Sequence, residues 1–179
     1  MKLRKKFFKI FIFINFIICL IYIIIYISVS KYNIYVNNKK IDYYFNNEGN
    51  KIIVNNPYNM ILEIPKLNLK YGIYDINDYK NNIEQNVTIL NYNYDEYFLK
   101  DVVIAAHSGN NHNSFFNTLY KLNFNDEIII YYKNKIFNYF VKNINVYKKT
   151  DYLLYEKNLK NLILVTCYSN DEYLIIEAE

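Results

Sequence analysis

The stretch Asn161-Leu-Ile-Leu-Val-Thr-Cys167-Tyr-Ser-Asn170 decides how the rest of the chain is interpreted. Its apolar run, residues 162–165, is typical of a buried strand, and Cys167 follows at the carboxyl end of that strand. A cysteine in this position is either a core residue or a nucleophile, because free cysteine is among the most buried residue types. Taken alone, the stretch favours the core residue.

Length and composition limit the class of protein. A chain of 179 residues accommodates one compact domain with appendages. The hydrophobic content of 53%, with 22 Tyr and 12 Phe, is enough for a core. Only 3 Gly are present. We therefore expect Asn to occupy left-handed turn positions that Gly usually takes.

The net charge of +4 belongs to the N-terminus. Five of the 21 Lys and Arg residues lie within residues 1–9, so the remainder carries 16 basic residues against 17 acidic ones. A nucleic-acid-binding domain would need a basic excess on its folded part. We therefore expect no nucleic-acid partner.

The N-terminal segment has the pattern of a membrane anchor. Residues 10–29 are almost wholly apolar and would span about 30 Å as a helix, the thickness of a bilayer core. The basic residues before them keep that end in the cytoplasm. A cleaved signal peptide is the alternative, with Ser28-Val29-Ser30 as a poor cleavage site and an apolar run longer than usual.

This pattern predicts three parts. Residues 1–30 form a basic cytoplasmic tail and a transmembrane signal anchor, residues 31–57 a polar juxtamembrane stalk, and residues 58–179 the folded domain. The protein would be a single-pass protein of the cell membrane with its folded domain outside the cell.

Eight short apolar or alternating runs in the folded domain predict an all-β barrel or sandwich with few helices. The runs are residues 60–65, 67–72, 87–90, 101–106, 127–132, 136–146, 162–165 and 173–178. Ser114 is expected to cap a short helix, with Phe115, Leu119 and Leu122 on one face.

His107 follows the strand at 101–106 in the same way that Cys167 follows its own strand. If the two strands are neighbours, the side chains meet at one rim of the barrel. A thiol attacks as thiolate and needs such a partner. The other histidine, His112, is expected in a solvated or capping role. A metal site built from these residues lacks CxxC or HxxxH spacing, so we expect no metal and no cofactor.

Four segments, taken in order, resemble the sortases, the membrane-anchored cysteine transpeptidases of Gram-positive bacteria. Ile163-Leu-Val-Thr-Cys167 resembles the T-L-x-T-C motif of the family, and Val103-Ile-Ala-Ala-His107-Ser-Gly109 resembles its histidine segment. Residues 115–128 resemble the F-x-x-L-x-x-L-x-x-G-D-x-I stretch, with Asn125 where glycine is usual, and Leu62-Glu-Ile-Pro-Lys-Leu67 resembles the opening I-P-K-I strand. The resemblance covers roughly residues 58–179.

The resemblance implies an eight-stranded sortase β-barrel with short helices, preceded by one N-terminal transmembrane helix. Cys167 would attack a C-terminal sorting signal of the L-P-x-T-G type and form a thioacyl-enzyme. His107 would act as general acid and then as general base. The implied partners are surface proteins or pilins that bear the signal, and an amine acceptor such as a cell-wall precursor or a pilin lysine.

One position departs from the family pattern. Sortases place an arginine at the start of the last strand, whereas this chain has Tyr173 there and no arginine after Arg4. Tyr173 is either an ordinary strand aromatic or a hydroxyl donor in place of the arginine. Otherwise a lysine elsewhere reaches the site, or the protein is a weak or inactive relative that binds sorting signals without cleaving them. A hydrolase that uses water in place of the amine is a further alternative.

Overall fold

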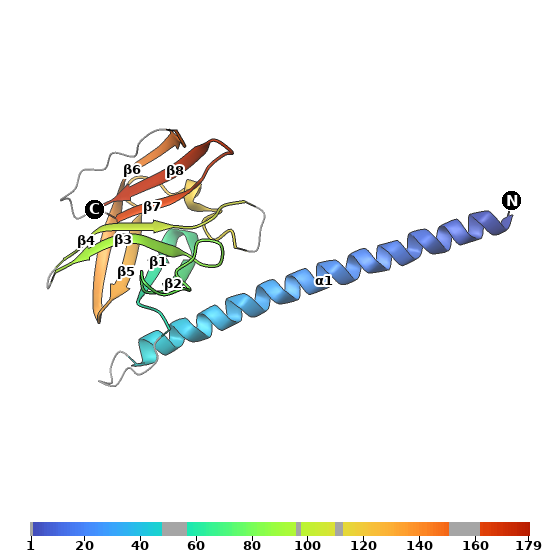
Figure 1. Cartoon of the computed structure of the whole chain (residues 1–179), viewed down its shortest axis with the longest axis horizontal. Coiled ribbons are helices and arrows are strands. Elements are labelled where there is room, and N and C mark those ends of the chain that lie inside the picture. Colours follow the sequence, from blue (N-terminus) through green and yellow to red (C-terminus); the bar gives the residue numbers. More distant parts are fainter. Residues whose placement is uncertain (1, 48–56, 96–97, 110–112, 151–161) are drawn as a thin grey trace. The chain divides into compact units, whose positions relative to one another are not determined.

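The computed structural model describes residues 2–47, 57–95, 98–109, 113–150 and 162–179, and its chain divides into two compact units, Met1–Lys39 and Lys40–Glu179. The first unit lies within a single helix, α1 (Lys2–Asn47), drawn in blue in Figure 1. The part of α1 from Phe7 to Phe45 is long and apolar enough to cross a membrane. The helix continues past residue 30 into the stretch expected as a stalk, and the boundaries at 30 and 57 stay a prediction.

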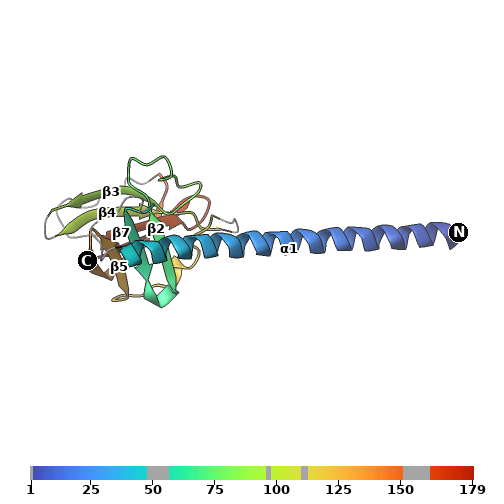
Figure 2. The ribbon, with the colours of Figure 1, turned by 90° about the horizontal axis from the view of Figure 1, so that it is seen from below.

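The second unit contains one curled sheet of eight strands, which confirms the all-β expectation (Figures 1 and 2). The strands are β1 (Met60–Ile64), β2 (Leu69–Ile73), β3 (Thr88–Tyr94), β4 (Leu99–Ala105), β5 (Glu127–Tyr132), β6 (Lys135–Lys148), β7 (Leu162–Cys167) and β8 (Glu172–Ala178). Their order across the sheet is β2-β1-β5-β6-β8-β7-β4-β3. Of the pairings described, only β4 with β7 is parallel.

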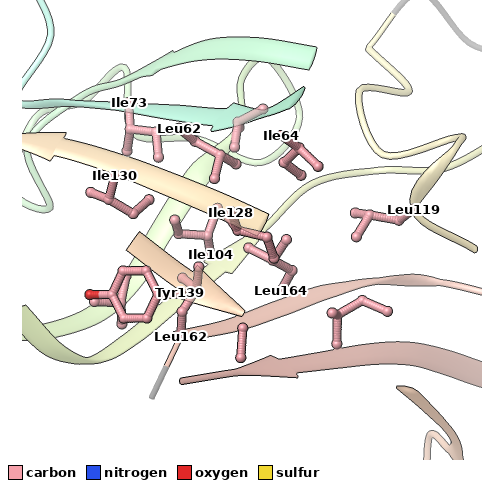
Figure 3. Close-up of a cluster of buried hydrophobic side chains, with 14 of the residues drawn as sticks. Leu62, Ile64, Ile73, Ile104, Leu119, Ile128, Ile130, Tyr139, Leu162 and Leu164 are labelled. Atoms are coloured by element: carbon pink, nitrogen blue, oxygen red, sulfur yellow. The ribbon is translucent and has the colours of Figure 1, made fainter. Parts of the chain in front are cut away.

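The concave interior of the sheet holds the hydrophobic core (Figure 3). Because side chains alternate along a strand, every second residue of a strand points inward. Figure 3 shows side chains of β1, β5 and β7 converging there, including Leu62, Ile130 and Leu164. Tyr139 of β6 is also buried, and its hydroxyl donates a hydrogen bond of 2.7 Å to the Leu99 carbonyl. Burial raises the pKa of this tyrosine.

The segment after β4 is not the helix expected from its apolar spacing. It forms turns and one short 3-10 helix, η2 (Leu119–Lys121), although Leu119 and Leu122 are buried as expected. The backbone N–H of Phe116 donates to the His107 carbonyl at 3.0 Å, and this bond ties the segment to the end of β4. The α-helix prediction was therefore wrong, because the only helical element in the described part of this segment is the single 3-10 turn η2.

Asparagine takes the left-handed turn positions, as expected from the scarcity of glycine. Asn68, Asn125 and Asn134 have φ angles of 52°, 68° and 57°. Asn125 precedes β5 and stands where the family motif has glycine. Its side chain tolerates the left-handed region better than most residues do, which explains how this chain builds the turn.

Within the second unit, the end of α1 packs against the sheet near β1 and β2. Ile41 and Tyr44 are buried in a small cluster with Tyr58 and Tyr74. Gly72 of β2 lies directly under the Tyr58 ring, since a Cβ there would come within 2.1 Å of a ring carbon. Glycine is therefore required at this point of close approach.

Asp126, in the turn before β5, accepts hydrogen bonds from Lys66 at 2.7 Å and from the backbone N–H of Asn123. Burial opposes ionisation of the carboxyl, but these two bonds outweigh it and lower the pKa of Asp126. A carboxyl with a lowered pKa stabilises the folded state above its unfolded pKa of about 3.9, and this contribution is lost as the pH falls through the folded value.

We expect Asp126→Asn to lower the free energy of unfolding at pH 7 by about 1 kcal/mol, because it weakens a charged hydrogen bond at a partly exposed site. The difference from the native chain should shrink below about pH 4. Thermal unfolding of both proteins from pH 7 to pH 2.5 measures it. A difference that stays constant over this range would contradict the assignment.

Candidate active site

Cys167 lies on the outer face of the sheet. It is the last residue of β7, where Leu162, Leu164 and Thr166 are buried and the first two belong to the core. Since side chains alternate along a strand, Cys167 points to the opposite face, and it is partly exposed. Cys167 is therefore not a core cysteine.

His107 lies two residues beyond the end of β4, the strand next to β7. The parallel pairing of β4 with β7 sets Ala105 opposite Val165, and the same register, continued by two residues, sets His107 opposite Cys167. Neighbouring strands are about 4.8 Å apart. Ile104 and Ala106 belong to the core, so His107 shares the outer face with Cys167. The register is compatible with the expectation that the two side chains meet at one rim, which stays a prediction.

Three hydrogen bonds fix the ends of these strands to each other. The Ala106 N–H donates to the Val165 carbonyl at 3.2 Å, and the buried Thr166 hydroxyl donates to the Ala106 carbonyl at 2.8 Å. The Ser108 hydroxyl donates to the Cys167 carbonyl. The residues that bear the thiol and the imidazole are thus held by their immediate neighbours.

Tyr173 lies on the other side of Cys167. The two residues are directly opposite in the antiparallel pairing of β7 with β8, and Tyr147 of β6 is directly opposite Tyr173. Directly paired residues share a face of the sheet. Tyr147 of β6, Tyr173 of β8 and Cys167 of β7 therefore form one row, which His107 continues just beyond the end of β4, and we call it the transverse row.

Lys149 lies next to the transverse row. Its ammonium is 5.2 Å from the centre of the Tyr173 ring, and its backbone N–H donates to the Asp171 carbonyl at 2.8 Å. The sequence indicated that a lysine elsewhere would be needed if Tyr173 does not act, but it did not indicate which one. The only signal is that Lys149 comes directly after β6, two residues beyond Tyr147.

Glu84 is a neighbour of His107 that the sequence did not indicate. One oxygen of its carboxylate is 3.3 Å from His107 Nε2. The side chain of His107 is 30% exposed, and the side chain of Glu84 is 70% exposed. The Asn113 amide donates to the Glu84 carbonyl at 2.8 Å and holds the backbone there. Glu84 lies in the segment between β2 and β3, far from His107 in sequence, and no motif marks it.

The described residues contain no group of three or more His, Cys, Asp or Glu side chains that could hold a metal ion. His112 lies outside the described residues. What the site offers is a partly exposed thiol with an imidazole beside it, and such a pair can carry out acyl transfer through a covalent intermediate.

Comparison with known proteins agrees with this geometry. A family model described as the sortase domain matches residues 62–179. No curated protein sequence matches the chain.

Solved structures with a similar fold include three sortases of different classes. They are a lid mutant of sortase A from Corynebacterium diphtheriae (24% identity, 68% of this chain and 69% of that chain, TM-score 0.55), sortase C1 from Streptococcus suis (23%, 66% and 70%, 0.55), and a sortase D5 transpeptidase from Clostridium perfringens (23%, 85% and 98%, 0.58). At these identities the structures show the fold, whereas the family model covers most of the chain. The chain therefore belongs to the sortase family.

Proposed function

We propose that this protein is a cysteine transpeptidase that cleaves a C-terminal sorting signal and transfers the acyl part to an amine. The observation that carries the proposal is the placement of Cys167 and His107 on one face at matching ends of two paired strands. The substrates would be surface proteins or pilins with an L-P-x-T-G-like signal. The acceptor would be an amine of a cell-wall precursor or of a pilin.

The proposed location of the protein in the cell rests on helix α1. Residues within α1 would anchor the protein in the cell membrane, with the basic N-terminal residues in the cytoplasm and residues 58–179 outside. A domain in that position meets exported substrates as they leave the membrane.

The chemistry follows from the two side chains. The Cys167 thiolate attacks the carbonyl carbon of the scissile amide, and the C–N bond then breaks as His107 gives a proton to the leaving amine. A thioester links the substrate to Cys167. His107 then takes a proton from the incoming amine, which attacks the thioester and releases the thiolate.

We expect Cys167→Ala to abolish cleavage of a fluorogenic peptide that contains Leu-Pro-Ala-Thr-Gly, because the thioester cannot form. His107→Ala should lower the rate by about 10²–10⁴, the usual contribution of general acid–base catalysis. Fluorescence release by the full chain in detergent measures both. Full activity of Cys167→Ala would rule out the proposal. Product analysis with and without added triglycine separates transpeptidation from hydrolysis.

A second candidate is a protein that binds sorting signals without cleaving them. The observation that favours it is Tyr173 in the position next to Cys167 where the family has an arginine. The two candidates differ in whether the thiol is able to react.

Alkylation by iodoacetamide distinguishes them. For a transpeptidase, we expect the Cys167 rate of the full chain to follow a pH profile that His107→Ala changes, because imidazole and thiol act together. The rate of labelling is measured by mass spectrometry of the peptide that contains Cys167. A thiol that does not react below about pH 9 would favour the binding protein.

Glu84 is expected to orient the imidazole. An exposed charge pair contributes up to about 1 kcal/mol, so Glu84→Gln should lower kcat up to about fivefold and leave KM nearly unchanged. The loss should shrink at high salt because the pair is exposed. Steady-state kinetics at low and high salt measure it. In the His107→Ala background the same substitution should have no effect, and an equal loss there would show that Glu84 does not act through His107.

A further inference from the structure

The geometry points to Lys149 as the cation that stabilises the oxyanion formed when Cys167 attacks, with Tyr173 as the platform that positions it. This inference rests on the proposed function and adds a residue to it. The transverse row supplies a nucleophile and an acid, but it contains neither a lysine nor an arginine.

Attack on a carbonyl creates a negative charge on the carbonyl oxygen. Hydrogen-bond donors or cations at that position are a large part of catalysis in acyl transfer. A donor must lie on the same face as the thiol, within reach of a carbonyl bound beside Cys167.

Lys149 satisfies both conditions. It is the first residue after β6, and its ammonium lies 5.2 Å from the centre of the ring of Tyr173, a residue of the transverse row. The Cβ atoms of a directly opposite pair such as Tyr173 and Cys167 are about 5 Å apart. Lys149 is exposed, and the flexible four-carbon stem of a lysine lets its ammonium move from the Tyr173 ring toward a carbonyl bound at Cys167.

The groups around the Lys149 ammonium also suit a role as oxyanion donor. Within the part of the chain that the structure describes, no carboxylate lies within 4 Å of Lys149, and its described contact is with the ring face. A cation held by a ring keeps its full charge and its three N–H donors for a substrate. An ion pair would instead have neutralised it.

Tyr173 acts through Lys149 in this assignment. The face of its ring attracts the ammonium and holds it on the Cys167 side of β6. Tyr173 is then a positioning residue, which differs from the alternative in which its hydroxyl is itself the donor.

The test compares two reactions of Cys167 in the full chain in detergent. Acetylation by p-nitrophenyl acetate forms a bond from sulfur to the acetyl carbon and expels p-nitrophenolate, so it passes through an oxyanion. Alkylation by iodoacetamide expels iodide at a saturated carbon and forms no oxyanion. Both rates are measured at about pH 8, where a lysine ammonium is charged, and each is divided by the thiolate fraction taken from the pH profile of alkylation. The rates of Cys167→Ala are subtracted.

We expect Lys149→Met to lower the acetylation rate roughly tenfold or more, below the ~10²–10³ of an enclosed donor because Lys149 is exposed. The alkylation rate should change less than twofold. Lys149→Arg should restore most of the acetylation rate, since it keeps the charge and the donors. Lys148→Met is the matched control, because Lys148 is also exposed but is on the opposite face of β6.

Double variants separate the two roles. Tyr173→Leu should lower acetylation, and the double variant Lys149→Met/Tyr173→Leu should lose no more than Lys149→Met alone. Additive losses would show that Tyr173 is an independent donor, and equal acetylation by Lys149→Met and the native chain would overturn the inference. If the native Cys167 reacts with neither reagent, the proposed function itself fails.

Discussion

The site depends on the parallel pairing of β4 with β7. Two neighbouring antiparallel strands have their carboxyl ends at opposite ends of the sheet, whereas two neighbouring parallel strands have them at the same end. In this otherwise antiparallel arrangement of described strands, the one parallel pair brings His107 and Cys167 out together. The Thr166 hydroxyl and the Ala106 N–H extend that pairing beyond the last regular hydrogen bonds.

Because side chains alternate along each strand, one face of the sheet forms the core and the other face carries the reactive side chains. Near the site, even-numbered residues of β4, β7 and β8 such as Ile104, Leu164 and Leu174 fill the interior. The odd-numbered Cys167 and Tyr173 belong to the transverse row. A slip of one residue in any of these strands would exchange the two faces and bury the thiol. The apolar inner faces therefore enforce the register on which the reactive side chains rely.

The charges around the transverse row come from outside the strands that hold Cys167 and His107. Glu84 reaches the imidazole from the segment after β2, and Lys149 reaches Tyr173 from the residue after β6. Glu84 and Lys149 are both exposed. The Glu84 carboxylate lies 3.3 Å from His107 Nε2, and the Lys149 ammonium lies 5.2 Å from the centre of the Tyr173 ring. The family pattern concentrates its positive charge in one arginine on the last strand, but this chain has Tyr173 there, so any cation must come from another segment.

The sequence by itself determined the strands, and it predicted Cys167 and His107 as the reactive pair. Apolar runs and alternation record which face of each strand is buried, and eight strands and the outward position of His107 follow from that local pattern. It failed in the segment after Ser114, where apolar spacing predicted an α-helix and the chain forms turns and one 3-10 helix. Only the tertiary structure decided that β4 neighbours β7 and that Glu84 and Lys149 border the row. Contacts between distant segments depend on how the sheet curls, and residues exposed in loops carry no periodic signal that reports it.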